Sequence, residues 1–194
     1  MADRDTYPVV LKLIAGPASE PFTSATLDTS TFLKDIDATA ETVLFGTYLI
    51  PTARRIAEAV LNRKLLTQTW EAVYDSQIPI IRLPFGQLQS ITTIKTVADD
   101  ETTTTETSGY YTVETGDAGC VFLRQGYNWT VTTRAYRNFK IQFVCGWTET
   151  DDIPISIMSG IMAIIAHLYY NREDLRGATA VAQSVLANDI LHSL

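Results

Sequence analysis

The chain contains few of the residues that usually form disulfides, bind metal ions or carry catalysis. Among its 194 residues are only two cysteines and two histidines. Cys120 and Cys145 lie far apart in strand-like sequence, so we expect two small buried side chains rather than a disulfide framework. His167 lies in an apolar segment, and His192 has only Asp189 nearby as a second potential ligand. The sequence therefore predicts no metal site.

The short motifs of the common enzyme classes are also missing. The sequence contains no Gly-x-Ser-x-Gly, no Gly-x-x-x-x-Gly-Lys-Ser/Thr and no Gly-x-Gly-x-x-Gly. Its two carboxylate pairs, Asp99-Asp100 and Asp151-Asp152, are sequence neighbours whose side chains point apart, so we interpret them as a solvated turn and a helix N-terminus. We therefore predict that the protein is not an enzyme and has neither catalytic nor cofactor-binding residues.

Positive charge is scarce as well. Fifteen Lys and Arg residues stand against 22 Asp and Glu, for a net charge of −7. Such a chain is repelled by phosphate groups, which disfavours tight binding of DNA but allows a surface that DNA slides past. The N-terminal sequence MADRDTYPVV does not resemble a signal peptide. Residues 153–171 approach the length of a membrane span, but Pro154, Gly160 and His167 interrupt them, so we expect a buried helix and no membrane association.

Helical periodicity dominates the first third of the chain after an irregular start over residues 1–24. We expect a short helix over residues 24–36 and a longer one over residues 39–61, whose apolar stripe includes Phe45, Leu49, Ala53, Ile56 and Val60. Pro51 removes one hydrogen bond from this longer helix, so we predict a kink there or two helices meeting end to end. Asn62 is suited to end the helix, because asparagine tolerates the left-handed conformation found at helix termini.

The middle of the chain changes to the alternating pattern of strands. Residues 68–74 begin the β region (66–146), and further strands are expected at 78–83, 89–97, 110–114, 119–124 and 138–146. The connections are too short for crossovers, which predicts an antiparallel β-meander.

One of these connections, residues 99–108, is acidic, rich in threonine and free of apolar residues. It is either a solvated hairpin with its turn at residues 99–101, or a protruding loop that reaches a neighbouring chain or lines a channel. In the second case the candidate residues are Asp99, Asp100, Glu101 and Glu106.

The last quarter returns to helix. Residues 154–171 form an apolar helix that should be buried on most sides, and Gly177 ends the charged run that follows it. Residues 178–194 are amphipathic and are expected to be a helical tail, which either packs back on its own domain or docks onto another chain. The predicted fold class is α+β: a small helical bundle (helices 24–62 and 154–171) with an inserted β-meander, forming one domain over residues 1–177, and a tail over 178–194.

A run of aromatic and basic residues allows a different function. Arg124, Tyr127, Trp129, Arg134, Tyr136 and Arg137 could recognise a peptide or stack on nucleic acid in a monomeric binding module. The net negative charge and the lack of a lysine cluster favour a structural or protein–protein role for them.

Seven segments of the chain form a distinctive ordered set. They are ARRIAEAVLNR, LLTQTWEAV, IIRLP, LQSITTI, GYYTVET, FKIQFVCGW and IPISIMSGIMAIIAHLYYNRE; they lie between residues 53 and 173, within a resemblance that covers roughly residues 20–175. In this order they resemble the head–tail connector (adaptor) family of long-tailed double-stranded DNA bacteriophages and of related prophages and gene transfer agents. Pro51 and the turn Phe85-Gly86-Gln87 depart from the usual family pattern.

The resemblance implies a structural protein of the virion neck, assembled in the bacterial cytoplasm. Members of the family form rings, typically of twelve copies, that stack beneath the portal protein and extend the DNA channel toward the tail. A stopper or tail-completion protein is implied below the ring, and DNA passes through without tight binding. The C-terminal segment commonly engages the portal, which implies portal contacts from Val181, Val185, Leu186 and Ile190.

Overall fold

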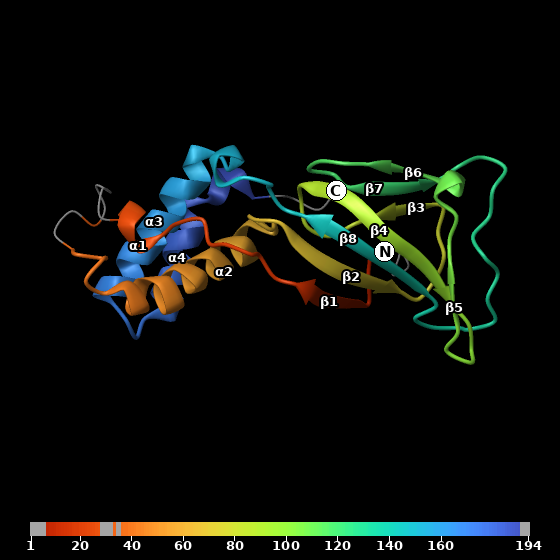
Figure 1. Ribbon diagram of the computed structural model, residues 1–194, viewed down its shortest axis with the longest axis horizontal. Helices are drawn as coiled ribbons and strands as arrows, with labels where there is room; N and C mark the ends of the chain where they lie inside the picture. Colours follow the sequence, from red (N-terminus) through yellow and green to blue (C-terminus); the bar gives the residue numbers. More distant parts are fainter. Residues whose placement is uncertain (1–6, 28–32, 34–35, 191–194) are drawn as a thin grey trace. The chain divides into compact units, whose positions relative to one another are not determined.

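The computed structural model describes residues 7–27, 33 and 36–190, and these residues form two compact units. The β unit comprises residues 7–16 and Thr67–Gly146, and the helical unit comprises Pro17–Leu66 and residues 147–190. The chain therefore leaves the helical unit once, builds most of the β unit and returns. The predicted α+β class, with antiparallel strands inserted between helical segments, is confirmed (Figure 1).

The helical unit is built around one apolar core. Its helices are α1 (Ser24–Leu27), α2 (Ile50–Leu61), α3 (Ile155–Tyr170) and α4 (Leu175–Val185), with the π-helix η3 (Leu44–Leu49) before α2 and the short 3-10 turns η5 (Thr150–Asp152) and η6 (Ala187–Asp189). The helix predicted over residues 24–36 is observed only as α1, and residues 28–32 and 34–35 lie outside the described residues. No helix in the described ranges is long and apolar enough to cross a membrane.

Pro51 lies at the point where a π-helix passes into an α-helix. The ring of Pro51 has no N–H to donate to the carbonyl of Thr47, so the regular ladder loses a bond at this point. The six residues before α2 form the π-helix η3, and the Ile50 N–H bonds to the carbonyl of Phe45, five residues back. Leu49 and Ile50 both keep right-handed helical dihedrals. The backbone therefore continues directly from the π-helix η3 into the α-helix α2, so two helical elements adjoin at Leu49 and Ile50.

Gly177, which ends the charged run in the sequence, lies in the first turn of α4. The side chain of Asp174 caps this helix by accepting a hydrogen bond of 2.8 Å from the Gly177 N–H. A cap of this kind satisfies an N–H group that would otherwise have no partner in the helix. Ala178, Ala182 and Leu186 are fully buried in the helical core, so most of the expected tail packs back on its own unit.

The β unit contains two antiparallel sheets. The larger has the order β1-β2-β8-β4-β5, from β1 (Val10–Ala15), β2 (Gln68–Tyr74), β8 (Phe139–Cys145), β4 (Leu88–Val97) and β5 (Thr103–Thr105). The smaller has the order β3-β7-β6, from β3 (Ile80–Arg82), β7 (Cys120–Leu123) and β6 (Tyr111–Glu114), which follows the 3-10 turn η4 (Ser108–Tyr110). The antiparallel pairing and six predicted strands are confirmed, but the order is not that of a simple meander, since β8 lies between β2 and β4.

One strand lies where irregular chain was expected. β1 pairs with β2 over Val10–Ala15. Its sequence, VLKLIA, is apolar at successive positions and so lacks the alternation from which the other strands were predicted. Pairing with β2, more than fifty residues later in the chain, is what makes this segment a strand.

The alternating residues of the larger sheet define its two faces. Phe139, Ile141, Phe143 and Cys145 of β8 are buried at every second position, and their partners Tyr74 and Ala72 of β2 lie on the same face. This face packs against the buried Ile81 and Val121 of the smaller sheet in one apolar cluster. The two predicted buried cysteines are both free, with Cys145 in this cluster and Cys120 half-buried.

Candidate interaction surfaces

Within the described residues, no group of three or more His, Cys, Asp or Glu side chains is arranged to hold a metal ion. His167 of α3 lies with its Nε2 atom 3.4 Å from the Oδ2 atom of Asp174. Asp174 already serves as the cap of α4, so this contact belongs to the packing of α3 against α4. His192 lies outside the described residues.

The end of α2 is held by a buried cluster of charges. Arg54 and Glu58 are only 5% and 4% exposed, and the Arg54 Nη1 atom lies 3.2 Å from Glu58 Oε1. Arg54 also donates hydrogen bonds of 2.7 and 3.2 Å to the two carboxylate oxygens of Glu20. Burial alone would lower the pKa of Arg54, but the hydrogen bonds to Glu20 and the charge of Glu58 raise it above its ordinary value.

The same Glu58 carboxylate fixes the chain after the helix. Its Oε1 atom accepts a hydrogen bond of 3.2 Å from the Leu65 N–H, and the Lys64 ammonium lies 3.7 Å from its Oε2 atom. Asn62 ends α2 with a φ of 53° and a ψ of 35°, which confirms the left-handed stop predicted from the sequence. Glu58 was not predicted as part of this join, and its partners are Arg54, four residues before it, and the adjacent Lys64 and Leu65 after it.

The acidic loop is a hairpin turn held by its own unit. Asp99 accepts a hydrogen bond of 2.5 Å from the Thr133 hydroxyl, and Glu101 pairs with Arg134 at 2.6 Å. Asp100 accepts two bonds from Thr102, and the bond from the hydroxyl group holds the pKa of the Asp100 carboxyl below its ordinary value. The solvated hairpin is therefore the observed form, with the three acidic side chains exposed at its tip.

Glu106 is buried, unlike the other three acidic residues of this loop. It is 5% exposed, and its Oε1 atom accepts hydrogen bonds of 2.6 Å from the Thr96 hydroxyl and 3.2 Å from the Thr130 N–H. Gln77 donates to Thr96 and to the Thr130 carbonyl in the same network. In this position Glu106 joins β4 to the long loop before β8 and does not face solvent.

The four residues expected to contact a portal do not share one surface. Leu186 is fully buried and lies against Gly160 of α3, where an added Cβ would come within 2.3 Å of the Leu186 side chain. Val181 packs partly against the helical core. Val185 is 43% exposed, and Ile190 is half-buried beyond η6. Val185 is therefore the exposed apolar residue of these four, Val181 and Ile190 are half-buried, and Leu186 is buried.

The aromatic and basic residues at 124–137 are likewise divided among different environments. Trp129 is 7% exposed in the core of the β unit, and its indole N–H donates a bond of 3.0 Å to the Ile78 carbonyl. Arg134 is paired with Glu101, and Tyr127 stacks on Tyr110 with ring centroids 4.8 Å apart. Tyr136 is 72% exposed, and its carbonyl accepts a hydrogen bond of 2.9 Å from Arg134 Nε.

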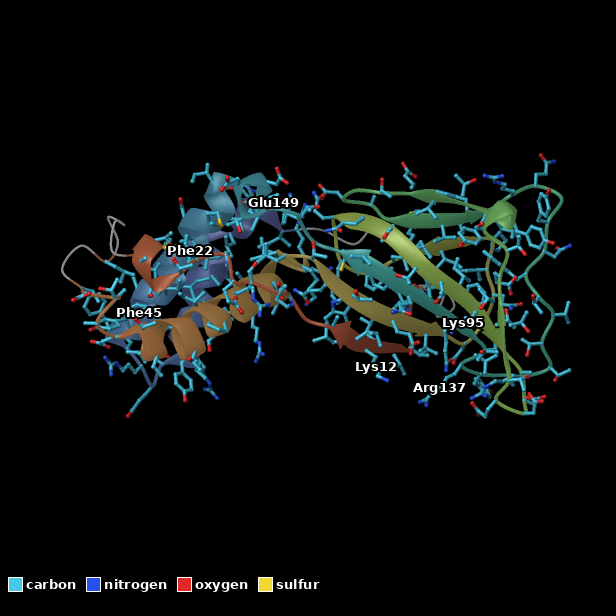
Figure 2. All side chains as sticks on the ribbon, in the orientation of Figure 1. Lys12, Phe22, Phe45, Lys95, Arg137 and Glu149 are labelled. Atoms are coloured by element: carbon cyan, nitrogen blue, oxygen red, sulfur yellow. The ribbon has the colours of Figure 1, made fainter. Side chains whose placement is uncertain are left out.

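Two surfaces of the larger sheet were not predicted. Its outer face carries three of the chain's five lysines, because the register places Lys12 beside Glu71 and Lys140 beside Lys95 on the side away from the core. Figure 2 shows the labelled Lys12 and Lys95 on the same side of the β unit. The second surface is the exposed apolar edge strand β1. Both depend on strand pairing, which sequence periodicity does not specify.

Comparison with known proteins identifies the fold. No protein-family model matches the chain, and no curated protein matches its sequence. A chain from the neck of an empty gene transfer agent (GTA) particle, solved with C6 symmetry, matches with a TM-score of 0.72 at 13% identity, covering 96% of this chain and 98% of that chain. The fold is that of a gene transfer agent neck protein.

Two further GTA structures match over the same extent. A chain of the native GTA virion has a TM-score of 0.69 at 14% identity, and a chain of the native GTA neck, solved with C12 symmetry, has a TM-score of 0.66 at 13% identity. Each match covers 96% of this chain and 98% of the other, so the likeness includes both units.

Proposed function

We propose that this chain is a structural component of a virion neck, a head–tail connector that forms a ring under the portal, extends the DNA channel and joins capsid to tail. The observation that supports this proposal is the likeness of fold to GTA neck chains over nearly the full length of both chains. In this role the chain acts in the virion after assembly in the bacterial cytoplasm.

The ring would contain about twelve copies, with a portal protein above and a stopper or tail-completion protein below. Two of the similar neck chains were solved in particles with C6 and C12 symmetry, both of which are compatible with a twelve-membered ring. The exposed acids Asp99, Asp100 and Glu101 are proposed to face the channel, where they would repel the phosphates of passing DNA. Glu106 supports the base of this hairpin from within the unit.

The portal contact is proposed for the end of the chain. Val185 and Ile190 supply its accessible apolar surface, while Val181 and Leu186 hold the segment on the helical core. Deleting residues 178–194 would also remove Ala178 and Ala182 from that core, so a point substitution separates docking from folding better than a truncation does.

Reconstitution with the portal protein of the same particle tests the proposal. Wild type should join the portal and give rings in electron micrographs, and a reconstruction should place about twelve copies between portal and tail. Val185→Glu should weaken joining to the portal, whereas Val131→Glu, at a 90% exposed position of the β unit, should not.

Two results would contradict parts of this proposal. A wild-type chain that neither joins the portal nor appears in purified necks would overturn the connector role itself. Equal joining by wild type and Val185→Glu would overturn the portal contact alone. A strictly monomeric chain that binds DNA with a steep dependence on salt would instead support a nucleic-acid-binding module.

A further inference from the structure

β1 presents an unusual amount of apolar surface. It lies at the edge of the larger sheet, and among the described residues it pairs with β2 alone. All six of its residues are exposed. The large apolar side chains in and just before the strand have exposed fractions between 36% and 50%, and they are Tyr7, Val9, Val10, Leu11, Leu13 and Ile14.

Both faces of β1 contribute to this surface. Leu11 and Leu13 lie opposite Ala72 and Trp70, on the face that is covered by the smaller sheet further along. They are nevertheless 38% and 46% exposed and lie outside the apolar cluster of the β unit. Val10 lies opposite Val73 on the other face. The edge therefore offers unpaired backbone groups flanked by apolar side chains above and below.

The other sheet edges are protected in the usual ways. β5 is a three-residue strand made entirely of threonine, and β3 is equally short and ends in the exposed Arg82. β6 has exposed polar residues at Thr112 and Glu114. Short length and charge are the devices by which proteins prevent unwanted strand pairing. β1 has one charge, Lys12, which lies opposite Glu71 in the register. Its regular pairing over Val10–Leu13 leaves it the least protected edge of the described chain.

We propose that β1 of one copy is covered by a second copy of this chain, through packing of its exposed apolar side chains against the neighbour. This inference rests on the proposed ring. A closed ring requires each copy to offer two different surfaces, so β1 contacts a surface other than β1 of the neighbour. Copies that each carry a net charge of −7 repel one another, and a nearly uncharged apolar strip is a favourable place for them to meet.

The test compares two doubly substituted variants of the full chain. Leu13→Lys with Ile14→Lys places charge on both faces of the exposed edge. Val131→Lys with Tyr136→Lys adds the same charge at positions 90% and 72% exposed in the loop before β8. Sedimentation velocity over a concentration series gives the association of each protein, and circular dichroism confirms that each is folded. Hydrogen exchange reports whether the amides of Val10–Ala15 gain protection on association.

The expected result is that wild type and the loop variant associate alike, while the edge variant has a dissociation constant raised by about a hundredfold, since each buried charge is costly. The β1 amides that do not bond to β2 should gain protection in the associated state.

Equal association of the edge variant would overturn the β1 contact and leave the ring in place. Association that stops at a dimer would indicate that the same surface is used by both copies, and it would overturn the proposal that β1 contacts a different surface of the neighbour. A wild type that stays monomeric at every concentration would also overturn the inference, whereas the connector role is tested separately by the neck reconstruction.

Discussion

At the scale of single residues, buried carboxylates fix the chain where its local structure changes. Glu58 ties the end of α2 to the backbone at Leu65, and Glu106 ties β4 to the loop at Thr130. Each is almost fully buried and satisfied by several donors. A buried charge is tolerated only with such partners, and removing one partner leaves the others uncompensated.

Replacing Glu58 should destabilise the helical unit strongly. Glu58→Ala leaves the Leu65 N–H without its acceptor and the buried Arg54 guanidinium with Glu20 as its remaining carboxylate partner, which should lower the free energy of unfolding by about 3 kcal/mol. Urea unfolding followed by circular dichroism measures the change. Glu173→Ala, at an exposed position of the same unit, should stay within about 0.5 kcal/mol of wild type. A small effect of Glu58→Ala would show that the cluster does not hold this join.

Asp100 should show the effect of its hydrogen bonds on acid titration. Its pKa is lowered in the folded protein, so its contribution to stability is present above the unfolded pKa and is lost as the pH falls below about 4. Thr102→Val removes the hydroxyl donor and should raise the pKa of Asp100 toward its ordinary value, as measured by NMR titration of the carboxyl group. Thr104→Val should leave this pKa unchanged, and an unchanged pKa in both variants would exclude the Thr102 hydroxyl as the cause.

At the scale of elements, the start of α4 is set by a contact between a side chain and the backbone three residues later in the chain. From the sequence, Gly177 was interpreted only as the end of the charged run before the last segment. In the structure it occupies the first turn of α4, where an added Cβ would lie 2.0 Å from Asp174 Oδ2 and 2.7 Å from His167 Nε2. Glycine at this position leaves room for the Asp174 and His167 side chains, and α4 begins directly after Asp174, its N-cap residue.

This crowding predicts opposite effects for two glycines in helical conformation. Gly46→Ala, with no atom within 4 Å of the added Cβ, should stabilise the protein by about 0.5–1 kcal/mol. Gly177→Ala should give no gain or a loss, because the methyl group displaces the capping carboxylate, and a lost cap costs about 1 kcal/mol. Thermal unfolding of both variants measures the difference. Equal stabilisation by the two substitutions would rule out the crowding around Gly177.

At the scale of the whole molecule, the charge distribution limits what the chain binds. The net charge of −7 disfavours DNA, yet Lys12, Lys95 and Lys140 share one face of the larger sheet. In the proposed neck ring, through which DNA would pass, weak contact would be an advantage, because the number of phosphate contacts sets both affinity and residence.

The purified chain should therefore bind duplex DNA only weakly at physiological salt. We expect a dissociation constant above about 10⁻⁴ M, the weak limit of non-specific binding, in fluorescence anisotropy with a labelled duplex. Lys95→Glu with Lys140→Glu should change the signal little. Micromolar binding by wild type that this variant abolishes would assign DNA binding to the lysine face and contradict passage without tight contact.

The sequence by itself determined the local features of this protein. The change of period at residue 68, the positions of six strands, the apolar helix α3 and the left-handed stop at Asn62 all depend on side chains close together in the chain. The effect of Pro51 is also local, because proline has no backbone N–H to donate to the helix. The sequence did not specify that a π-helix would form before it.

Only the tertiary structure decided the features that depend on distant partners. β8 lies between β2 and β4, β1 becomes a strand by pairing with β2, and Leu186 and Glu106 are buried by residues far from them in sequence. These contacts have no local signal, because burial and strand order depend on which elements meet in the folded chain. They also determine which apolar and acidic residues remain exposed for assembly.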